Sequence, residues 1–304
     1  MSPRLEAVGV SVRRGGRLAV EDVSFALEPG QCLGVAGPNA SGKSSLLGAL
    51  AGSLPLASGR VNFDGRPVRF GSVPAQVGFA TQEVAFYAHL TGRENLKLFG
   101  ALYDLTGHDL DVRIEELLNR LHMAPWADKP ARTYSGGLAR RLHLALAMIH
   151  NPTLLLFDEP TVGLDPQSRR TLLQALQDEM ELGTSIVITS QILGDLEIVA
   201  THVMVVRDGR AAVLDSTRSL MARLGTGMIV IELAQDRQVD LDLKGIPDLT
   251  SWTLREGVLR ARVTRPHEAL APILARLDRS GILAARIEVL PPTLDQVLTE
   301  LLPR

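Results

Sequence analysis

The residues with the clearest chemical pattern form a glycine-rich loop near the N-terminus. Its fixed positions, Gly37, Gly42, Lys43 and Ser44, match the spacing G-x-x-x-x-G-K-[ST]. Glycines let the backbone close around a phosphate with several N–H groups pointing inward, while a lysine adds positive charge and a serine hydroxyl ligates Mg²⁺. The sequence therefore predicts a phosphate-binding loop consisting of Gly37, Pro38, Asn39, Ala40, Ser41, Gly42, Lys43, Ser44 and Ser45.

Two adjacent carboxylates, Asp158 and Glu159, follow the apolar run Leu154-Leu155-Leu156-Phe157. An apolar strand that ends in such a pair places both groups at one edge of a sheet. Asp158 is expected to hold magnesium, directly or through water, and Glu159 to orient or deprotonate an attacking water. A solvated acidic turn is the alternative, and the glycine loop in the same chain disfavours it.

A third group of residues, Ser135-Gly136-Gly137, precedes a helix-period segment. A serine caps a helix well, and two glycines expose backbone N–H groups at the helix start. These residues therefore predict a second phosphate-binding surface. Standing alone, they would indicate an ordinary helix cap.

The elements that must position these groups alternate between strand and helix. The glycine loop lies between a short apolar strand at 31–36 and a helix at 44–50, and a strand at 154–157, a helix at 166–180 and a strand at 185–189 follow. Two β segments at 5–12 and 18–27 precede the loop, and a hairpin around Asp208-Gly209 closes the unit. This alternation predicts an α/β fold with a largely parallel sheet and an N-terminal antiparallel β subdomain.

A helical subdomain is expected at about 86–150, because segments 93–105, 112–122 and 137–149 carry apolar residues at helix spacing. Near Gly225-Thr226-Gly227 a second unit begins, with strands at 228–233, 252–254, 258–263 and 284–290 and helices at 268–280 and 294–301. The predicted domains are 1–220 and a small α+β module at 226–304, to which we assign a dimerisation or regulatory role.

Composition narrows the class of protein. The 304 residues are 45% hydrophobic and carry a net charge of −2, so no overall basic field attracts nucleic acid. The single cysteine, Cys32, excludes a disulfide within the chain. No apolar stretch reaches the roughly 18 residues of a membrane span, and the N-terminus lacks a signal peptide. We therefore expect a soluble chain whose membrane role, if any, comes through a partner.

Taken together, the motifs resemble those of the ATP-binding-cassette (ABC) ATPases over about residues 4–216. The order matches: the phosphate loop, Gln82, the signature at Ser135, the carboxylate pair and then Asp165. The resemblance implies a head-to-tail dimer in which ATP lies between the phosphate loop of one subunit and the signature of the other. It also implies that Gln82 contacts magnesium and water and senses a transmembrane partner, and that Asp165 lines the dimer interface.

Two further segments are similar to those of ABC-2-type drug and antibiotic exporters, whose membrane subunit is a separate polypeptide. They are Leu90-Thr91-Gly92-Arg93-Glu94-Asn95-Leu96 and Pro292-Thr293-Leu294-Asp295-Gln296-Val297. The resemblance implies an ATP-hydrolysing subunit, homodimeric or heterodimeric, at the inner face of the cell membrane, with ATP and Mg²⁺ as cofactors and a separate permease as partner. It does not identify the transported substrate.

Several positions depart from the family pattern. Gln191 stands where a histidine that contacts the γ-phosphate is usual, and Arg14 stands where an aromatic residue often stacks on adenine. Glutamine can donate a hydrogen bond but does not titrate near neutral pH, and a guanidinium can also stack on a base. Tyr134, Leu138 and Ala40 replace the usual leucine, glutamine and glycine. Alanine fits the loop only where φ need not be positive.

These departures keep two alternatives open. In one, the cassette binds ATP and hydrolyses it slowly or not at all, as a regulatory or heterodimer partner. In the other, it is a soluble ABC protein that acts on ribosomes or DNA, which the single phosphate loop and the near-neutral charge disfavour.

Overall fold

The computed structural model describes residues 3–224, 227–234, 241–290 and 293–301. By its internal contacts the chain divides into two units, Met1–Ser216 and Thr217–Arg304. The division falls a few residues before the boundary expected from the sequence. Of the residues quoted for that boundary and for the second exporter segment, Gly225, Thr226 and Pro292 lie outside the described residues.

The strands are β1 (Leu5–Arg14), β2 (Arg17–Leu27), β3 (Cys32–Ala36), β4 (Ser58–Phe63), β5 (Arg66–Pro67), β6 (Val77–Ala80), β7 (Leu154–Asp158), β8 (Ser185–Ser190), β9 (His202–Arg207), β10 (Arg210–Ser216), β11 (Gly227–Leu233), β12 (Leu249–Arg255), β13 (Val258–Val263) and β14 (Ala284–Leu290). The helices are α1 (Lys43–Leu50), α2 (Gly92–Ala101), α3 (Gly107–Arg120), α4 (Gly136–Met148), α5 (Pro166–Glu181), α6 (Leu193–Val199), α7 (Thr217–Leu224), α8 (Pro266–Arg279) and α9 (Leu294–Leu301), with short 3₁₀ turns at Ala124–Trp126 and Ala131–Thr133.

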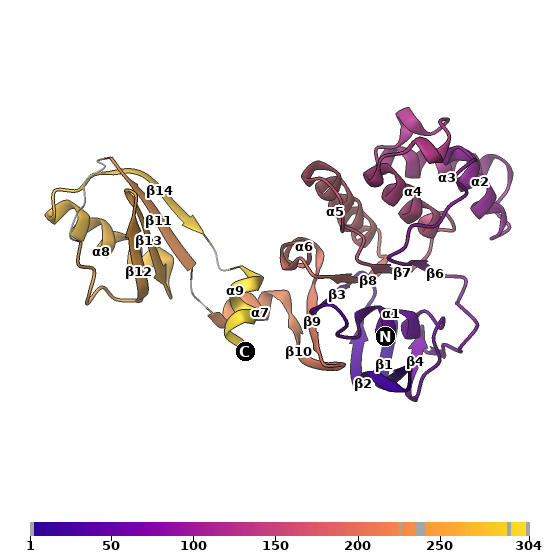
Figure 1. The fold of residues 1–304 in the computed structure, drawn as a ribbon, viewed down its shortest axis with the longest axis horizontal. Helices are drawn as coiled ribbons and strands as arrows, with labels where there is room; N and C mark the ends of the chain where they lie inside the picture. Colours follow the sequence, from indigo (N-terminus) through magenta and orange to yellow (C-terminus); the bar gives the residue numbers. More distant parts are fainter. Residues whose placement is uncertain (1–2, 225–226, 235–240, 291–292, 302–304) are drawn as a thin grey trace. The chain divides into compact units, whose positions relative to one another are not determined.

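The first unit has two sheets (Figure 1). A six-stranded sheet has the order β10-β9-β3-β8-β7-β6, in which β10 alone is antiparallel to its neighbour. Strands β3, β7 and β8 are buried along their whole length, as expected for parallel strands covered on both faces. The second sheet, β2-β1-β4-β5, is antiparallel. Both confirm the predicted α/β fold with an antiparallel β subdomain.

Helices α2, α3 and α4 lie between β6 and β7 in the chain and form the predicted helical insertion. Local chemistry starts α2, because Thr91 and Glu94 make a reciprocal capping box, with Thr91 Oγ1 accepting from Glu94 N–H and Glu94 Oε2 accepting from Thr91 N–H. The segment that suggested an exporter subunit therefore also has a structural role. It fixes where the insertion begins.

The second unit is an antiparallel sheet of order β12-β13-β11-β14 whose core packs against α8. Helix α7, which the sequence did not predict, contacts α9. The first three residues of α7, Thr217-Arg218-Ser219, are polar and show no apolar pattern of helix spacing. Leu220 is buried in the folded structure, which the sequence alone does not indicate. The described residues contain no helix long and apolar enough to cross a membrane.

Candidate nucleotide site

The phosphate loop connects the central strand β3 to the start of α1. Gly42 closes the loop with φ of 108°, and a Cβ there would lie 2.2 Å from the carbonyl oxygen of Ala19. Gly37 is equally constrained, since its Cβ would lie 2.3 Å from the carbonyl oxygen of Val206. Neither position tolerates a side chain without moving backbone, so both glycines are required by the fold around the loop.

Lys43 lies inside the loop, 4% exposed. Its ammonium donates to the carbonyl oxygens of Gly37 at 2.8 Å and Pro38 at 2.9 Å, and lies 3.6 Å from Oε1 of Glu159. The positive charge is therefore held in place before any phosphate arrives. Such preorganisation lowers the cost of binding an anion.

The carboxylate pair is oriented by the neighbouring strand. Asp158 ends β7, and its register partner Thr189 on β8 donates through Oγ1 to Asp158 Oδ1 at 2.6 Å. The same Thr189 oxygen accepts from Glu159 N–H at 2.9 Å. Glu159 has φ of 46°, a left-handed conformation that turns the chain directly after the strand. One threonine thus fixes both acidic residues at the carboxyl end of the sheet.

A cavity of 190 Å³ lies between the loop and Glu159, and Gln82 lines it together with Glu159 and the loop residues from Asn39 to Ser45. Asp158 is not among the residues that line it. Two buried oxygens of this lining, Ser41 Oγ and Glu159 Oε2, have no hydrogen-bond partner among the described residues. Buried polar atoms are normally satisfied, so unpaired ones beside a fixed cation indicate room for a polar ligand. The residues fit a phosphate group, and the hydroxyl of Ser44, the amide of Gln82 and the carboxylate of Asp158 are the hard oxygen ligands that Mg²⁺ prefers.

Gln191 follows β8, and its amide Nε2 donates to Glu159 Oε1 at 2.7 Å. That oxygen is therefore shared between Gln191 and the nearby ammonium of Lys43. The other oxygen, Oε2, has no hydrogen-bond partner in the part of the chain that the structure describes. The glutamine thus reaches the carboxylate that the sequence singled out, as a neutral donor.

Sequence reasoning missed Arg140. This buried residue of α4 donates from Nη1 to the backbone oxygens of Gln82 at 2.8 Å and Thr81 at 3.4 Å. Burial lowers the pKa of its guanidinium, and the charges of Asp158 and Glu159 oppose that shift. Arg140 couples the helix behind the signature to the segment that carries Gln82. In the sequence, only the position of Arg140 five residues after Ser135 could have suggested that this arginine contacts the site.

The signature residues lie elsewhere in the subunit. Ser135 caps α4, with Oγ accepting from Leu138 N–H at 3.3 Å, and Gly136 and Gly137 begin the helix. Ser135 lines a separate cavity of 670 Å³ together with Asp165, whose carboxylate caps α5. Within one subunit the signature is therefore not part of the cavity at Lys43. Arg14 is exposed at the end of β1 and is likewise outside the residues that line that cavity.

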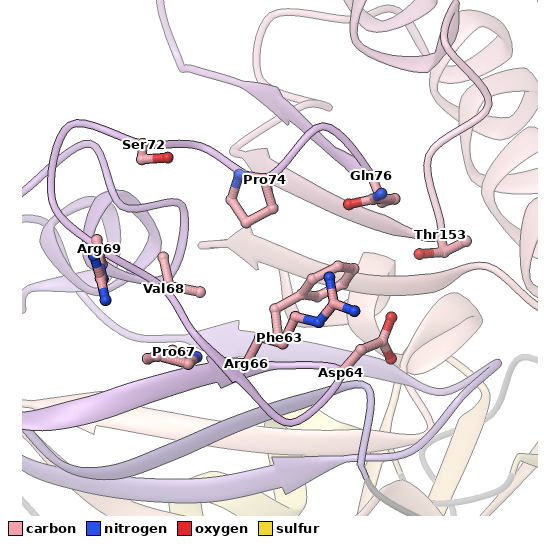
Figure 2. A pocket seen from close by; sticks show the side chains of 10 residues that line it. All are labelled: Phe63, Asp64, Arg66, Pro67, Val68, Arg69, Ser72, Pro74, Gln76 and Thr153. Carbon is pink, nitrogen blue, oxygen red and sulfur yellow. The ribbon is translucent and has the colours of Figure 1, made fainter.

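A third groove lies between the β4–β5 hairpin and the segment that leads to β6 (Figure 2). It measures 490 Å³, more than the cavity at Lys43. Its lining residues are Phe63, Asp64, Arg66, Pro67, Val68, Arg69, Ser72, Pro74, Gln76 and Thr153, and none of the predicted site residues is among them. Cavity size alone would have identified the wrong place.

Comparisons with known proteins agree with this geometry. The family model described as "ABC transporter" matches residues 20–162. The daunorubicin resistance ATP-binding protein DrrA3 of Streptomyces coeruleorubidus is 33% identical over 297 residues, which cover 96% of this chain and 94% of that protein. This chain belongs to the ABC transporter family. Its relatives include ATP-binding proteins named for drug resistance, which agrees with the resemblance read from the sequence.

Other relatives support the same placement. The linearmycin resistance ATP-binding protein LnrL of Bacillus subtilis is 28% identical over 98% of this chain and 97% of its own length. Among solved structures, an ATP-binding subunit of an ABC transporter superposes with a TM-score of 0.66 at 23% identity, over 73% of this chain and 93% of that one. At such identity the structural likeness concerns the fold alone, and the fold it shows is the ABC ATPase cassette.

Proposed function

We propose that this ABC protein binds ATP with Mg²⁺ and hydrolyses it to drive a separate transmembrane permease that exports a drug-like or antibiotic compound. The observation that carries the proposal is Glu159. Its Oε1 is held by Gln191 and lies near Lys43, while its Oε2 is buried, unbonded and part of the phosphate cavity. A carboxylate with one free oxygen beside a phosphate site can accept the proton of an attacking water.

The remaining roles follow from the chemistry of the lining. The loop N–H groups and Lys43 bind the phosphates, and Ser44, Gln82 and Asp158 hold Mg²⁺, which neutralises charge on the β- and γ-phosphate oxygens when it is bound. Arg14 is assigned to the adenine ring, on which a guanidinium can stack. Its exposed position in the subunit leaves its side chain accessible to a base.

The site is completed by a second subunit, identical or related. Ser135 and Gly136 are exposed, and a Cβ at Gly136 would meet no atom within 4 Å, so the N–H groups at this helix start are accessible to an outside ligand. A solved dimeric ATP-binding cassette in a post-hydrolysis state with ADP and Pi has the same fold, with a TM-score of 0.63 at 22% identity over 70% of this chain. We infer the same kind of dimer here, with the signature of one subunit facing the phosphate loop of the other.

The permease is assigned to the surface next to Gln82. Val84 and Tyr87 follow that residue and are 40% and 58% exposed, and Leu98 and Leu102 of the neighbouring α2 region are 37% and 71% exposed. Asn95 fixes this surface, because its Oδ1 accepts from Tyr87 N–H at 2.8 Å. Exposed apolar side chains grouped in this way mark a protein interface. Docking there would hold the chain at the inner face of the membrane.

Glu159→Gln in the full-length protein tests hydrolysis. We expect ATP binding to be kept and turnover to fall by about 10²- to 10⁴-fold, because the amide cannot accept the proton. Phosphate release measures turnover, and fluorescent ATP binding measures affinity. Glu256→Gln is the matched control, since Glu256 is an exposed glutamate that also has positive φ, at 50°. Unchanged turnover in the Glu159 variant would contradict the proposal.

The alternative, a cassette that mainly binds ATP, is favoured by the neutral donor at position 191. We expect Gln191→Ala to lower turnover by roughly tenfold or more, because a hydrogen bond to a charged group contributes about 1.5–3 kcal/mol. Gln174→Ala, which removes an exposed glutamine bonded to Asp178, is the control.

Gln191→His distinguishes the two forms of the cassette. If the natural chain hydrolyses ATP at a barely measurable rate and Gln191→His raises that rate by orders of magnitude, the natural chain is the binding-only form. If it leaves a robust rate unchanged, the glutamine is no defect.

A further inference from the structure

One edge of the C-terminal sheet is apolar and uncovered. Strand β14 is the outermost strand beside β11 (Figure 1), and six of its seven residues are exposed. Ile287, Val289 and Leu290 are 41%, 36% and 43% exposed, and the preceding Leu283 is 61% exposed. Among the described residues no strand pairs with the outer side of β14.

The opposite edge of the same sheet is built differently. On β12, the apolar residues Leu249, Trp252 and Leu254 pack against the core formed with α8. The register Ile287↔Ile231 and Val289↔Ile229 puts the β14 residues on that same face, yet they stay exposed. An exposed apolar edge strand is a template for pairing with another chain, and stable proteins normally cover or charge it.

The sequence of β14 is complementary to itself in the antiparallel direction. Two strands that pair around Ile287 place Arg286 of each copy opposite Glu288 of the other, and Ile287 opposite Ile287. Every further pair in this register, such as Ala285 with Val289, is apolar. Opposite charges and apolar groups directly across an antiparallel pair are the contacts that stabilise a sheet.

Neighbouring registers lack this complementarity. Centring the pair on Arg286 places arginine opposite arginine, and centring it on Glu288 places glutamate opposite glutamate, both of which are unfavourable. Within the described part of one copy, Arg286 forms an ion pair with Glu288 of its own strand, and both side chains are exposed, at 64% and 41%. Such exposed pairs contribute little, so the two charges remain available for a partner.

We propose that β14 pairs with β14 of a second copy of this chain, antiparallel and centred on Ile287, so that two four-stranded sheets become one of eight strands. This contact needs no nucleotide. It is distinct from the ATP-dependent contact between phosphate loop and signature. It would keep two ATPase subunits together between cycles of ATP binding and release.

Charge reversal on the full-length protein, without nucleotide, tests the proposal by sedimentation. We expect the natural chain to be dimeric, and Arg286→Glu and Glu288→Arg each to weaken dimerisation at least about tenfold, since two favourable pairs become repulsive. An equimolar mixture of the two single variants should restore dimers, because each reversed strand then faces its complement. The double variant with both reversals should dimerise as the natural chain does.

A monomeric natural chain at micromolar concentration would overturn the proposal, as would an equimolar mixture of the two single variants that stays monomeric.

A cysteine at the centre of the proposed strand pair gives a second test of the same contact. Ile287→Cys is expected to give a cross-linked dimer with a short bifunctional maleimide, while the natural chain does not, because Cys32 is fully buried. Lys43→Ala should leave this dimer intact while abolishing ATP binding. Failure of this proposal and failure of the proposed ATPase function are therefore distinguishable.

Discussion

Ala40 has φ of 62° within the phosphate loop, a left-handed conformation that favours glycine. The sequence raised this point as a condition for alanine to fit, and the structure shows that the condition is not met. An L-residue in this region costs about 1–2 kcal/mol. Loop closure around Lys43 therefore proceeds against local backbone strain. The strain belongs to one residue and can be removed without touching any ligand-binding side chain.

Ala40→Gly is expected to raise the free energy of unfolding by about 0.5–1 kcal/mol, because relief of strain exceeds the greater freedom of glycine in the unfolded chain. Urea unfolding measures the change. Ala49→Gly, at a buried position in the last turn of α1, is the control and should change stability in the opposite direction. A loss of stability on Ala40→Gly would show that the left-handed conformation is not strained.

Among the elements, helix α4 reaches the site although it contributes no residue to the lining of the phosphate cavity. It starts at the signature, holds the Gln82 segment through Arg140, and buries His143 against the rest of the unit. Burial and the nearby charge of Arg140 lower the pKa of His143 to about 4. The folded helix therefore holds a neutral imidazole, while the unfolded chain binds a proton below about pH 6.5.

The sign of the pH dependence follows from this shift. The contribution of neutral His143 to the free energy of unfolding is fully present above about pH 6.5. It falls as the pH drops toward 4, where the folded form also takes up the proton. At pH 5 the loss is about 2 kcal/mol relative to pH 8. His143→Gln, which cannot titrate, should reduce this loss in urea unfolding. His150 has a pKa lowered in the same direction, so part of the dependence should remain.

His108→Gln, on the exposed face of α3, is the control and should leave the pH profile of the natural chain unchanged. An equally steep loss of stability in the His143 variant would show that this imidazole is not the group that takes up the proton.

At the scale of the whole molecule, the two units have separate hydrophobic cores. The larger joins both sheets of the first unit across α1, and the smaller joins the C-terminal sheet to α8. The residues that line the phosphate cavity all belong to the first unit. Nucleotide should therefore stabilise one core and leave the other unaffected.

Scanning calorimetry of the full chain is expected to resolve two transitions. ATP with Mg²⁺ at about one hundred times its dissociation constant should stabilise the first unit by about 2.7 kcal/mol and leave the second transition in place. Lys43→Ala should abolish the shift. A single transition that moves as a whole with ATP would show that the two units unfold together.

The sequence by itself determined the family of this protein, most of its elements and the residues to which we assign its chemistry. Gly42, Lys43 and the carboxylate pair could be read from type and spacing, because phosphate binding needs those groups in that order. Ser135 marked a helix start because a cap is a local feature. Helix α7 was not predicted from the sequence, because its packing depends on a contact with α9.

Only the tertiary structure decided how these groups meet. Thr189 reaches both Asp158 and Glu159 because β7 and β8 pair in one register, and Arg140 reaches Gln82 because the insertion packs beside β6. The exposure of β14 likewise depends on the order of the strands, which leaves β14 at one edge of the sheet. Such contacts join residues far apart in the chain, and no local pattern encodes them. The sequence identified the residues to which we assign ATP binding and hydrolysis, and long-range packing determined which oxygen of Glu159 has no hydrogen-bond partner among the described residues.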